Sequence, residues 1–212
     1  CIDAISMSFH KLCGPMGIGM LVVNNDLISG YKLEGQIVGT QQGGLRGGTE
    51  NVPAIAGAMA GLRYTFVNRE VKNDKLRAMR TAIVDALVKN YTLIPYEDCF
   101  SAKKLPDFGF VLLGPTGPGR YVPSTLYLSF VSKRGRFCNM DLKKELDDRG
   151  VVISIGSACN TKSTKASHVL SSIRAPDVVK KGVVRVSLGD GNTAGETRQF
   201  IKILISCVDN QL

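Results

Sequence analysis

Residues 8–19 read SFHKLCGPMGIG and lead into the apolar run Met20–Val23, which predicts a short buried strand. The glycines permit positive φ angles and the proline stiffens the turn, so this backbone can approach a ligand closely. A lysine in such a turn is suited to Schiff-base chemistry once burial lowers its pKa. Ser8 and His10 could both donate hydrogen bonds to a phosphate. On the local pattern alone, a solvated Lys11 in a glycine-rich turn is the commoner meaning of so short a motif.

A second informative stretch, SIGSACNT, occupies residues 154–161 and follows the predicted strand Val151–Ile153. Its glycine and serines give the backbone freedom that a packed cysteine would not need, so Cys159 can be presented to a ligand from a loop. A lone cysteine at the end of a strand is more often a small buried hydrophobic residue. Residues 154–161 therefore indicate a ligand-facing cysteine only in combination with residues 8–19.

The third stretch, VRVSLG at residues 184–189, alternates apolar and polar positions as a half-buried strand does. Its arginine, Arg185, is predicted on the face opposite the valines. Burying an arginine in an apolar strand is costly unless the side chain meets an anion. That anion is either a ligand or a structural carboxylate of the protein, and the strand pattern leaves both open.

These three stretches and a fourth, RGGTEN at residues 46–51, follow one another in an order that resembles the NifS-like cysteine desulfurases. Those proteins are pyridoxal-phosphate (PLP) enzymes of the class V aminotransferase group. The resemblance extends from Ser8 to Gly189, nearly the whole chain. It implies an α/β protein with the PLP-dependent transferase type I fold, comprising the end of the large domain and the small C-terminal α/β domain.

The resemblance also implies roles for individual residues. Lys11 would carry PLP covalently, while Ser8, His10 and Thr49 would bind its phosphate. Thr49 would reach the cofactor of the neighbouring subunit, which implies a homodimer with shared sites.

By the same resemblance, Arg185 would hold the α-carboxylate of the substrate, L-cysteine. Cys159 would take the substrate sulfur as a persulfide, with L-alanine as the product. Residues 160–167 would form an arm that delivers the sulfur to an acceptor protein.

The chain departs from the family pattern in several ways. In the family, about half of the polypeptide precedes the cofactor lysine, including a ring-stacking histidine and an aspartate that pairs with the pyridine nitrogen. Here only ten residues precede Lys11, so we expect this chain to be the C-terminal half of a longer or split protein. Asp3 matches a different position of the family pattern and is not that aspartate. Phe9 and Met16 stand where the family usually has glycine and lysine, which indicates a divergent member. Three alternatives remain open: a catalytically silent scaffold, a selenocysteine lyase, or another class V lyase.

Composition narrows the classes of function. The 212 residues are 44% hydrophobic, as in an ordinary globular protein, and no apolar run reaches the ~20 residues of a membrane span. The net charge of +9 is spread over short basic runs without interleaved aromatic residues, which argues against a nucleic-acid partner. Six scattered cysteines and two histidines argue against a zinc site or a disulfide framework. We expect a cytoplasmic location, with an organellar or viral context left open.

The predicted organisation has three parts. Residues 1–50 are the end of the PLP-binding large domain, with the lysine loop, a strand and a glycine-rich segment. Residues 51–90 are a linking helix, capped by Asn51 and broken near Asn68 or Asn73. Residues 91–212 are the small domain with the cysteine loop. Its predicted elements are strands at 91–96, 108–113, 126–130, 151–153 and 184–188, a helix that Asn139 caps and that runs through Arg149, and a last helix that Thr193 and Glu196 cap.

Overall fold

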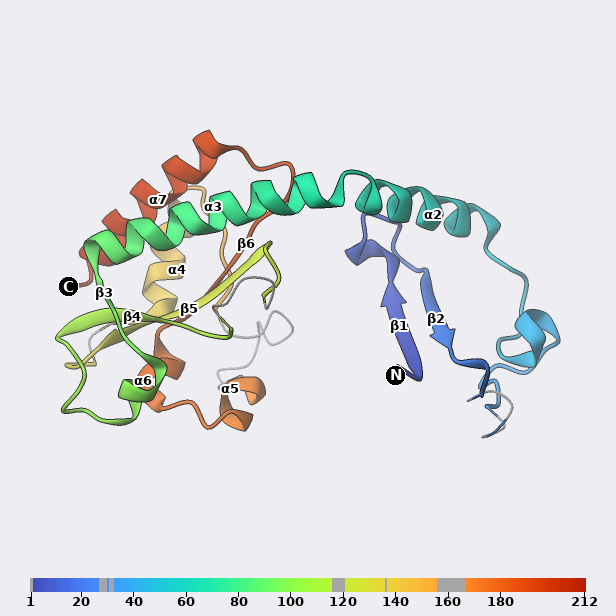
Figure 1. Cartoon of the computed structure of the whole chain (residues 1–212), viewed down its shortest axis with the longest axis horizontal. Helices are drawn as coiled ribbons and strands as arrows, with labels where there is room; N and C mark the ends of the chain where they lie inside the picture. Colours follow the sequence, from blue (N-terminus) through green and yellow to red (C-terminus); the bar gives the residue numbers. More distant parts are fainter. Residues whose placement is uncertain (1, 27–29, 31–32, 116–120, 136, 156–166) are drawn as a thin grey trace. The chain divides into compact units, whose positions relative to one another are not determined.

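The computed structural model describes residues 2–26, 30, 33–115, 121–135, 137–155 and 167–212. The chain divides into two compact units, residues 1–69 and 70–212 (Figure 1). In the backbone between them, helix α2 (Val52–Phe66) ends and helix α3 (Arg69–Asn90) begins. Asn68 has a φ of 56°, a conformation that no α-helix contains. The predicted break near Asn68 is therefore confirmed.

The first unit is built on a β-hairpin and a helix. Strand β1 (Ala4–Ser8) runs antiparallel to β2 (Gly19–Val23), and the 3₁₀ turn η1 (Phe9–Lys11) begins the connection between them. A second 3₁₀ turn, η2 (Gln41–Gly44), interrupts the glycine-rich segment. The carboxamide of Asn51 caps α2 by accepting a hydrogen bond from the amide of Ala54 at 3.2 Å, as predicted. Strand β1 was not predicted, because only Ile5 and Met7 among its five residues are large and apolar, which is a weak sequence signal for a strand.

Helix α2 packs closely against the turn that follows η1. A Cβ added to Gly61 would lie 2.6 Å from the amide nitrogen of Gly14 and 2.7 Å from the carbonyl carbon of Cys13. One helical turn earlier, a Cβ on Gly57 would meet only the ring of Pro15, at 3.2 Å. The hydroxyl of Thr65 donates to the carbonyl of Leu12 at 3.1 Å. The helix therefore supports the turn through backbone contacts that tolerate no side chain at Gly61.

We expect Gly61→Ala to destabilise the protein, although alanine is the better helix former by about 1 kcal/mol. The added methyl meets backbone atoms that can yield only if the turn moves, and such overpacking typically costs about 1–3 kcal/mol. Gly57→Ala is the matched control, since its methyl meets only the side-chain ring of Pro15 at 3.2 Å, which has to yield by a few tenths of an ångström, and it should be close to neutral. Urea unfolding of the two variants measures the difference. Equal free energies of unfolding for Gly61→Ala and Gly57→Ala would show that Gly61 does not pack closely against the turn.

The second unit contains a four-stranded sheet in the order β3-β4-β5-β6. Strand β3 (Thr92–Leu93) pairs parallel to β4 (Phe108–Leu112), whereas β4 with β5 (Thr125–Ser132) and β5 with β6 (Val183–Ser187) are antiparallel. Besides α3, the described part of this unit contains the 3₁₀ helix η3 and four further α-helices. These are η3 (Tyr96–Phe100), α4 (Asn139–Asp148), α5 (His168–Ser172), α6 (Asp177–Lys181) and α7 (Ala194–Asp209).

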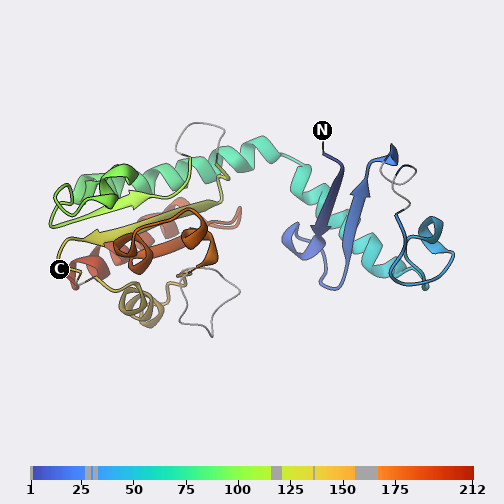
Figure 2. The same cartoon turned by 90° about the horizontal axis from the view of Figure 1, so that it is seen from below.

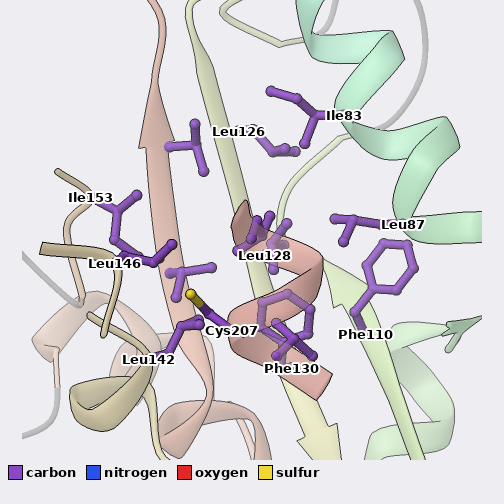
Figure 3. Packing of buried hydrophobic residues seen from close by; sticks show 14 of the residues in the cluster. Ile83, Leu87, Phe110, Leu126, Leu128, Phe130, Leu142, Leu146, Ile153 and Cys207 are labelled. Carbon is purple, nitrogen blue, oxygen red and sulfur yellow. The ribbon is translucent and has the colours of Figure 1, made fainter. Parts of the chain in front are cut away.

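The sheet of the second unit is covered on both faces. On one face, side chains of α3, α4 and α7 pack on the strands around the buried rings of Phe110 and Phe130, and Cys207 of α7 lies among them (Figure 3). On the other face, Leu170 of α5 and Val179 of α6 pack against Val131 and Val183. The short helices α5 and α6 are drawn in orange in Figure 2. Alternating strand residues supply both clusters, because successive side chains point to opposite faces. This unit thus has a core of its own.

Some predicted elements of the second unit are corrected by the structure. Residues 151–153 form no strand: Val152 is 86% exposed, and only Ser154 makes a bridge to β6. The N-cap of α4 is Cys138, and the side chain of Asn139 instead donates to the carbonyl of Val183 at 2.9 Å. The strand predicted at 91–96 is limited to two residues. The capping box of Thr193 and Glu196 is confirmed.

Candidate functional site

The turn that carries Lys11 is held by its own backbone. The carbonyl of Phe9 accepts hydrogen bonds from the amides of Leu12 and Gly14, both at 2.8 Å, and the amide of Phe9 donates to Ile18 across the hairpin at 3.2 Å. The Phe9 side chain is buried, with 4% exposed. The phenylalanine that replaces the family's glycine therefore anchors the turn as part of the packing of the first unit.

Three side chains of this turn carry polar groups toward solvent. Ser8, His10 and Lys11 are all exposed, and Ser8 precedes η1 without using its hydroxyl as a cap. Within the part of the chain that the structure describes, none of the three makes a side-chain hydrogen bond or an ion pair. A hydroxyl, an imidazole and an amine at the end of one strand form a donor set suited to a phosphate and an aldehyde.

Thr49 lies on the loop before α2. Gln41 fixes this loop by accepting from the amide of Gly48 at 3.1 Å, and Gln42 donates to the carboxylate of Glu50 at 3.0 and 3.1 Å. Thr49 is exposed and lines a hollow of about 780 Å³ between the hairpin, this loop and α2. Ser8, His10 and Lys11 are not among the described residues that line this hollow.

Arg185 lies in the middle of β6 and is partly buried. Its backbone pairs with Tyr127 of β5 on one side and with Ser154 on the other, where the two backbone hydrogen bonds measure 2.7 and 3.1 Å. Its Nη2 donates to the hydroxyl of Ser154 at 3.2 Å, and its Nε is buried without a partner. Among the described residues, no carboxylate pairs with this guanidinium. The arginine therefore has donors left to offer an anion.

The predicted alternation of Val184 and Val186 with Arg185 is confirmed. Val184 and Val186 are buried on the opposite face, whereas Val183 shares the face of the arginine. Loss of hydration raises the pKa of Tyr127, and the nearby Arg185 cation offsets this in part. No role was predicted for Tyr127 or Ser154. Only their positions in the sequence could have indicated a role. Tyr127 alternates with leucines in its strand, and Ser154 is the first residue of the stretch that contains Cys159.

Cys159 lies outside the described residues, as do all of residues 156–166. His168, for which no role was predicted, is exposed at the start of α5. The candidate residues thus belong to separate units: Ser8, His10, Lys11 and Thr49 to the first, and Arg185 to the second. None of the described helices combines the length and apolar character that crossing a bilayer requires.

Comparison with known sequences gives a consistent picture. Residues 1–104 match the family model of class V aminotransferases. The chain is 31% identical over 204 residues to the cysteine desulfurase IscS of Clostridium botulinum, covering 96% of this chain and 45% of that protein. It is 30% identical to a putative cysteine desulfurase, IscS 1, of Bacillus subtilis, with 95% and 47% covered. The chain therefore spans less than half the length of the curated relatives that it matches.

Solved structures show the same fold. A NifS-like protein superposes with a TM-score of 0.73 at 24% identity, over 99% of this chain and 47% of its own length. The cysteine desulfurase CsdA of Escherichia coli superposes with a TM-score of 0.64 at 20% identity, over all of this chain and 47% of its own. The predicted fold, the type I fold of PLP-dependent enzymes, is thus confirmed. Together, the motif order, the sequence relatives and the fold show that residues 1–104 match the class V aminotransferase family and that nearly the whole chain is similar to NifS-like proteins.

Proposed function

We propose that this chain forms part of a PLP-dependent cysteine desulfurase that converts L-cysteine to L-alanine and carries the sulfur as a persulfide on Cys159. The observation that carries the proposal is the match of 96% of the chain to a protein named cysteine desulfurase. The complete enzyme would be a cytoplasmic homodimer that passes its sulfur to an acceptor protein, because the family motifs imply a shared site at Thr49 and an arm after Cys159.

The donor set at the end of β1 fits PLP. Ser8 and His10 would bind the phosphate, together with Thr49 from the neighbouring subunit, and Lys11 would bind the aldehyde carbon. When bound, PLP supplies an electron sink that stabilises negative charge developing on the substrate. Lys11 then acts as the base and acid that moves a proton from the Cα of the substrate.

Arg185 would fix the substrate by its α-carboxylate. A planar guanidinium can donate two parallel hydrogen bonds to the two oxygens of one carboxylate. The Nε of Arg185 is buried without a partner, so it is available as one of these two donors. Ser154 holds Nη2 and so limits rotation of the guanidinium. This orientation would place the Cβ–Sγ bond of the substrate at a fixed position relative to its carboxylate.

Cys159 would act as the nucleophile in its thiolate form. Its sulfur attacks the Sγ of the substrate and forms an S–S bond, while the Cβ–Sγ bond breaks and its electron pair stays with the carbon skeleton. Protonation of that carbon gives alanine, and the sulfur remains on Cys159 as the outer atom of the persulfide. The step needs no external oxidant, because the thiolate pair forms the S–S bond and the carbon that keeps the Cβ–Sγ pair is reduced as the two sulfur atoms are oxidised.

Product analysis tests this proposal. The complete enzyme with PLP and L-cysteine should yield alanine and, with a thiol reductant, sulfide in equal amounts. A protein that yields neither product while it binds PLP would be a scaffold. Turnover of selenocysteine without turnover of cysteine would assign it as a selenocysteine lyase.

We expect Arg185→Lys to raise KM for L-cysteine by roughly 10- to 100-fold, as loss of a charge-assisted hydrogen bond does. Lysine keeps the charge but lacks the rigid, planar pair of donors that matches the two oxygens of a carboxylate. The matched control is Arg149→Lys, because Arg149 makes a surface ion pair with Glu145 and should leave KM unchanged. A KM that Arg185→Lys does not alter would remove the carboxylate role from this residue.

A further inference from the structure

Three side chains form a row across the sheet of the second unit. Tyr127 of β5 lies directly opposite Arg185 of β6, and Ser154 lies opposite Arg185 on its other side. Directly opposed residues of antiparallel strands point their side chains to the same face, which here is the face that includes Val183. Arg185 is therefore flanked by a phenol on one side and by a serine hydroxyl on the other.

The hydrogen-bond register places the side chains of Tyr127 and Arg185 close together. The amide and the carbonyl of Arg185 both bond to Ser154, at 2.7 and 3.1 Å, and the carbonyl of Tyr127 accepts from the amide of Leu113 at 2.9 Å. The backbone groups of the two residues thus point away from each other, so they form a non-bonded antiparallel pair. In such pairs the Cα atoms lie about 4.5 Å apart, and the side chains are closer than in bonded pairs.

Tyr127 combines a packed ring with a hydroxyl that has donors and acceptors to offer. Like Tyr96, it packs against the buried cluster that includes Val131. The phenol and the guanidinium lie within electrostatic reach of each other, because the Arg185 cation partly offsets the rise in the pKa of Tyr127 that burial causes. Among the described residues, the hydroxyl of Tyr127 makes no hydrogen bond, and it is not one of the buried polar atoms that lack a partner. This hydroxyl can therefore donate to a group that arrives from outside.

The guanidinium of Arg185 needs an acceptor. Its Nε is buried without a partner, while its Nη2 donates to the hydroxyl of Ser154 at 3.2 Å. A buried charged donor without an acceptor is costly, and an anion at this site would remove the cost. An anion that reaches this guanidinium also lies beside Tyr127. A carboxylate has two oxygens with about four acceptor sites, so it can accept from the guanidinium and from a phenol at the same time.

We propose that Tyr127 is a second binding residue for the carboxylate that Arg185 holds, and that its hydroxyl donates a hydrogen bond to one of the carboxylate oxygens. Ser154 and Tyr127 then have different tasks on the two sides of the arginine. Ser154 orients the guanidinium, whereas Tyr127 contacts the anion itself. The identity of this anion, the α-carboxylate of L-cysteine, rests on the proposed function, but the anion site can be tested without turnover.

An acetate titration of the 212-residue chain tests the site. The Nε–H resonances of isotope-labelled arginine are followed by NMR while sodium acetate is added at constant ionic strength. We expect the Arg185 resonance to shift, whereas that of Arg149, which is paired with Glu145, stays in place. In Tyr127→Phe the acetate concentration at half-maximal shift should rise roughly 10-fold, as loss of a hydrogen bond to a charged group does. An unchanged midpoint in this variant would overturn the proposal, as would an Arg185 resonance that responds to inorganic phosphate only or to neither anion.

Tyr96→Phe is the matched control for the loss of the hydroxyl. Tyr96 packs against the same cluster as Tyr127, and its own hydroxyl is buried without a partner. Removing that hydroxyl takes away no contact with an anion, so the acetate midpoint should not change. An equal rise of the midpoint in Tyr96→Phe and Tyr127→Phe would assign the effect to the packing of the cluster and would contradict a direct contact.

Kinetics of the complete enzyme place the same contact on the substrate. Tyr127→Phe should raise KM for L-cysteine roughly 10-fold and leave kcat within about twofold, because the carboxylate is held equally in the ground state and in the transition state. In an Arg185→Lys background the effect of Tyr127→Phe should be clearly smaller, since both side chains bind one group. Strictly additive effects would contradict a shared carboxylate.

The two experiments separate this inference from the proposed function. Turnover of L-cysteine with an unchanged KM in Tyr127→Phe would contradict the role of Tyr127 alone. An acetate site that depends on Tyr127, in a complete protein that forms no alanine from L-cysteine, would instead contradict the proposed function and leave the anion site in place.

Discussion

Replacing Cys159 with alanine should abolish the formation of both alanine and sulfide from L-cysteine in the complete enzyme. Removal of the thiol leaves no nucleophile to accept the substrate sulfur, so the Cβ–Sγ bond cannot be broken by sulfur transfer. Residual activity should be at the background of the assay. Binding of PLP should survive, and with it the visible absorbance of the bound cofactor, because the group that binds the aldehyde carbon is Lys11.

The control for this variant is Cys138→Ala, which removes another thiol of the second unit. Cys138 is half-buried at the N-cap of α4, where its backbone carbonyl accepts from Leu142 and its thiol caps nothing. The control should keep full activity. Loss of cofactor absorbance in Cys159→Ala would show that this residue is needed for the fold of the site, and unchanged alanine formation would remove it from the mechanism.

Replacing Lys11 with alanine should lower kcat by at least about 10²–10⁴-fold, the contribution of a positioned acid–base group. The actual loss should exceed that range, because Lys11 would also hold the cofactor covalently. PLP should then dialyse out of the variant while the wild-type protein retains it. Absorbance after dialysis and single-turnover alanine formation measure the two effects separately.

The matched control is Lys89→Ala, because Lys89 is exposed in the last turn of α3 and contributes only surface charge. It should retain cofactor and activity. Added methylamine, a small primary amine, should restore part of the proton transfer in Lys11→Ala but not the retention of PLP. A Lys11→Ala protein that keeps its cofactor and turnover would overturn the assignment of this residue.

Much of the fold was accessible from the sequence where the signal was local. The Asn51 cap, the break at Asn68 and the capping box at Thr193 each depend on a few neighbouring residues and are confirmed. Predictions failed where tertiary contacts decide the outcome. The apolar run 151–153 was predicted as a strand, but β6 pairs with β5 and bridges only to Ser154, which leaves Val152 in solvent.

The candidate site was predictable to the extent that it depends on motifs. The order of the four motifs carried the family resemblance, but it did not reveal that Phe9 is buried or that Gly61, more than 40 residues after residues 8–19, packs on the turn. The strand alternation gave the face of Arg185, whereas its hydrogen bond to Ser154 arises from a non-local bridge. Such contacts depend on how distant segments pair, and a single sequence does not encode them in any short pattern.

The bridge between Ser154 and Arg185 has a consequence for the range of the sulfur carrier. It pairs Ser154, the first residue of the stretch that contains Cys159, with β6, whose Arg185 would bind the substrate carboxylate. Cys159 follows Ser154 by five positions, and five residues of extended chain span at most about 18 Å. Under the proposed function, this tether sets an outer radius around Ser154, and a sulfur acceptor would have to bring its own thiol inside this radius. Lengthening the tether by inserted glycines would enlarge the set of acceptors at the expense of the effective concentration of the thiol at the substrate.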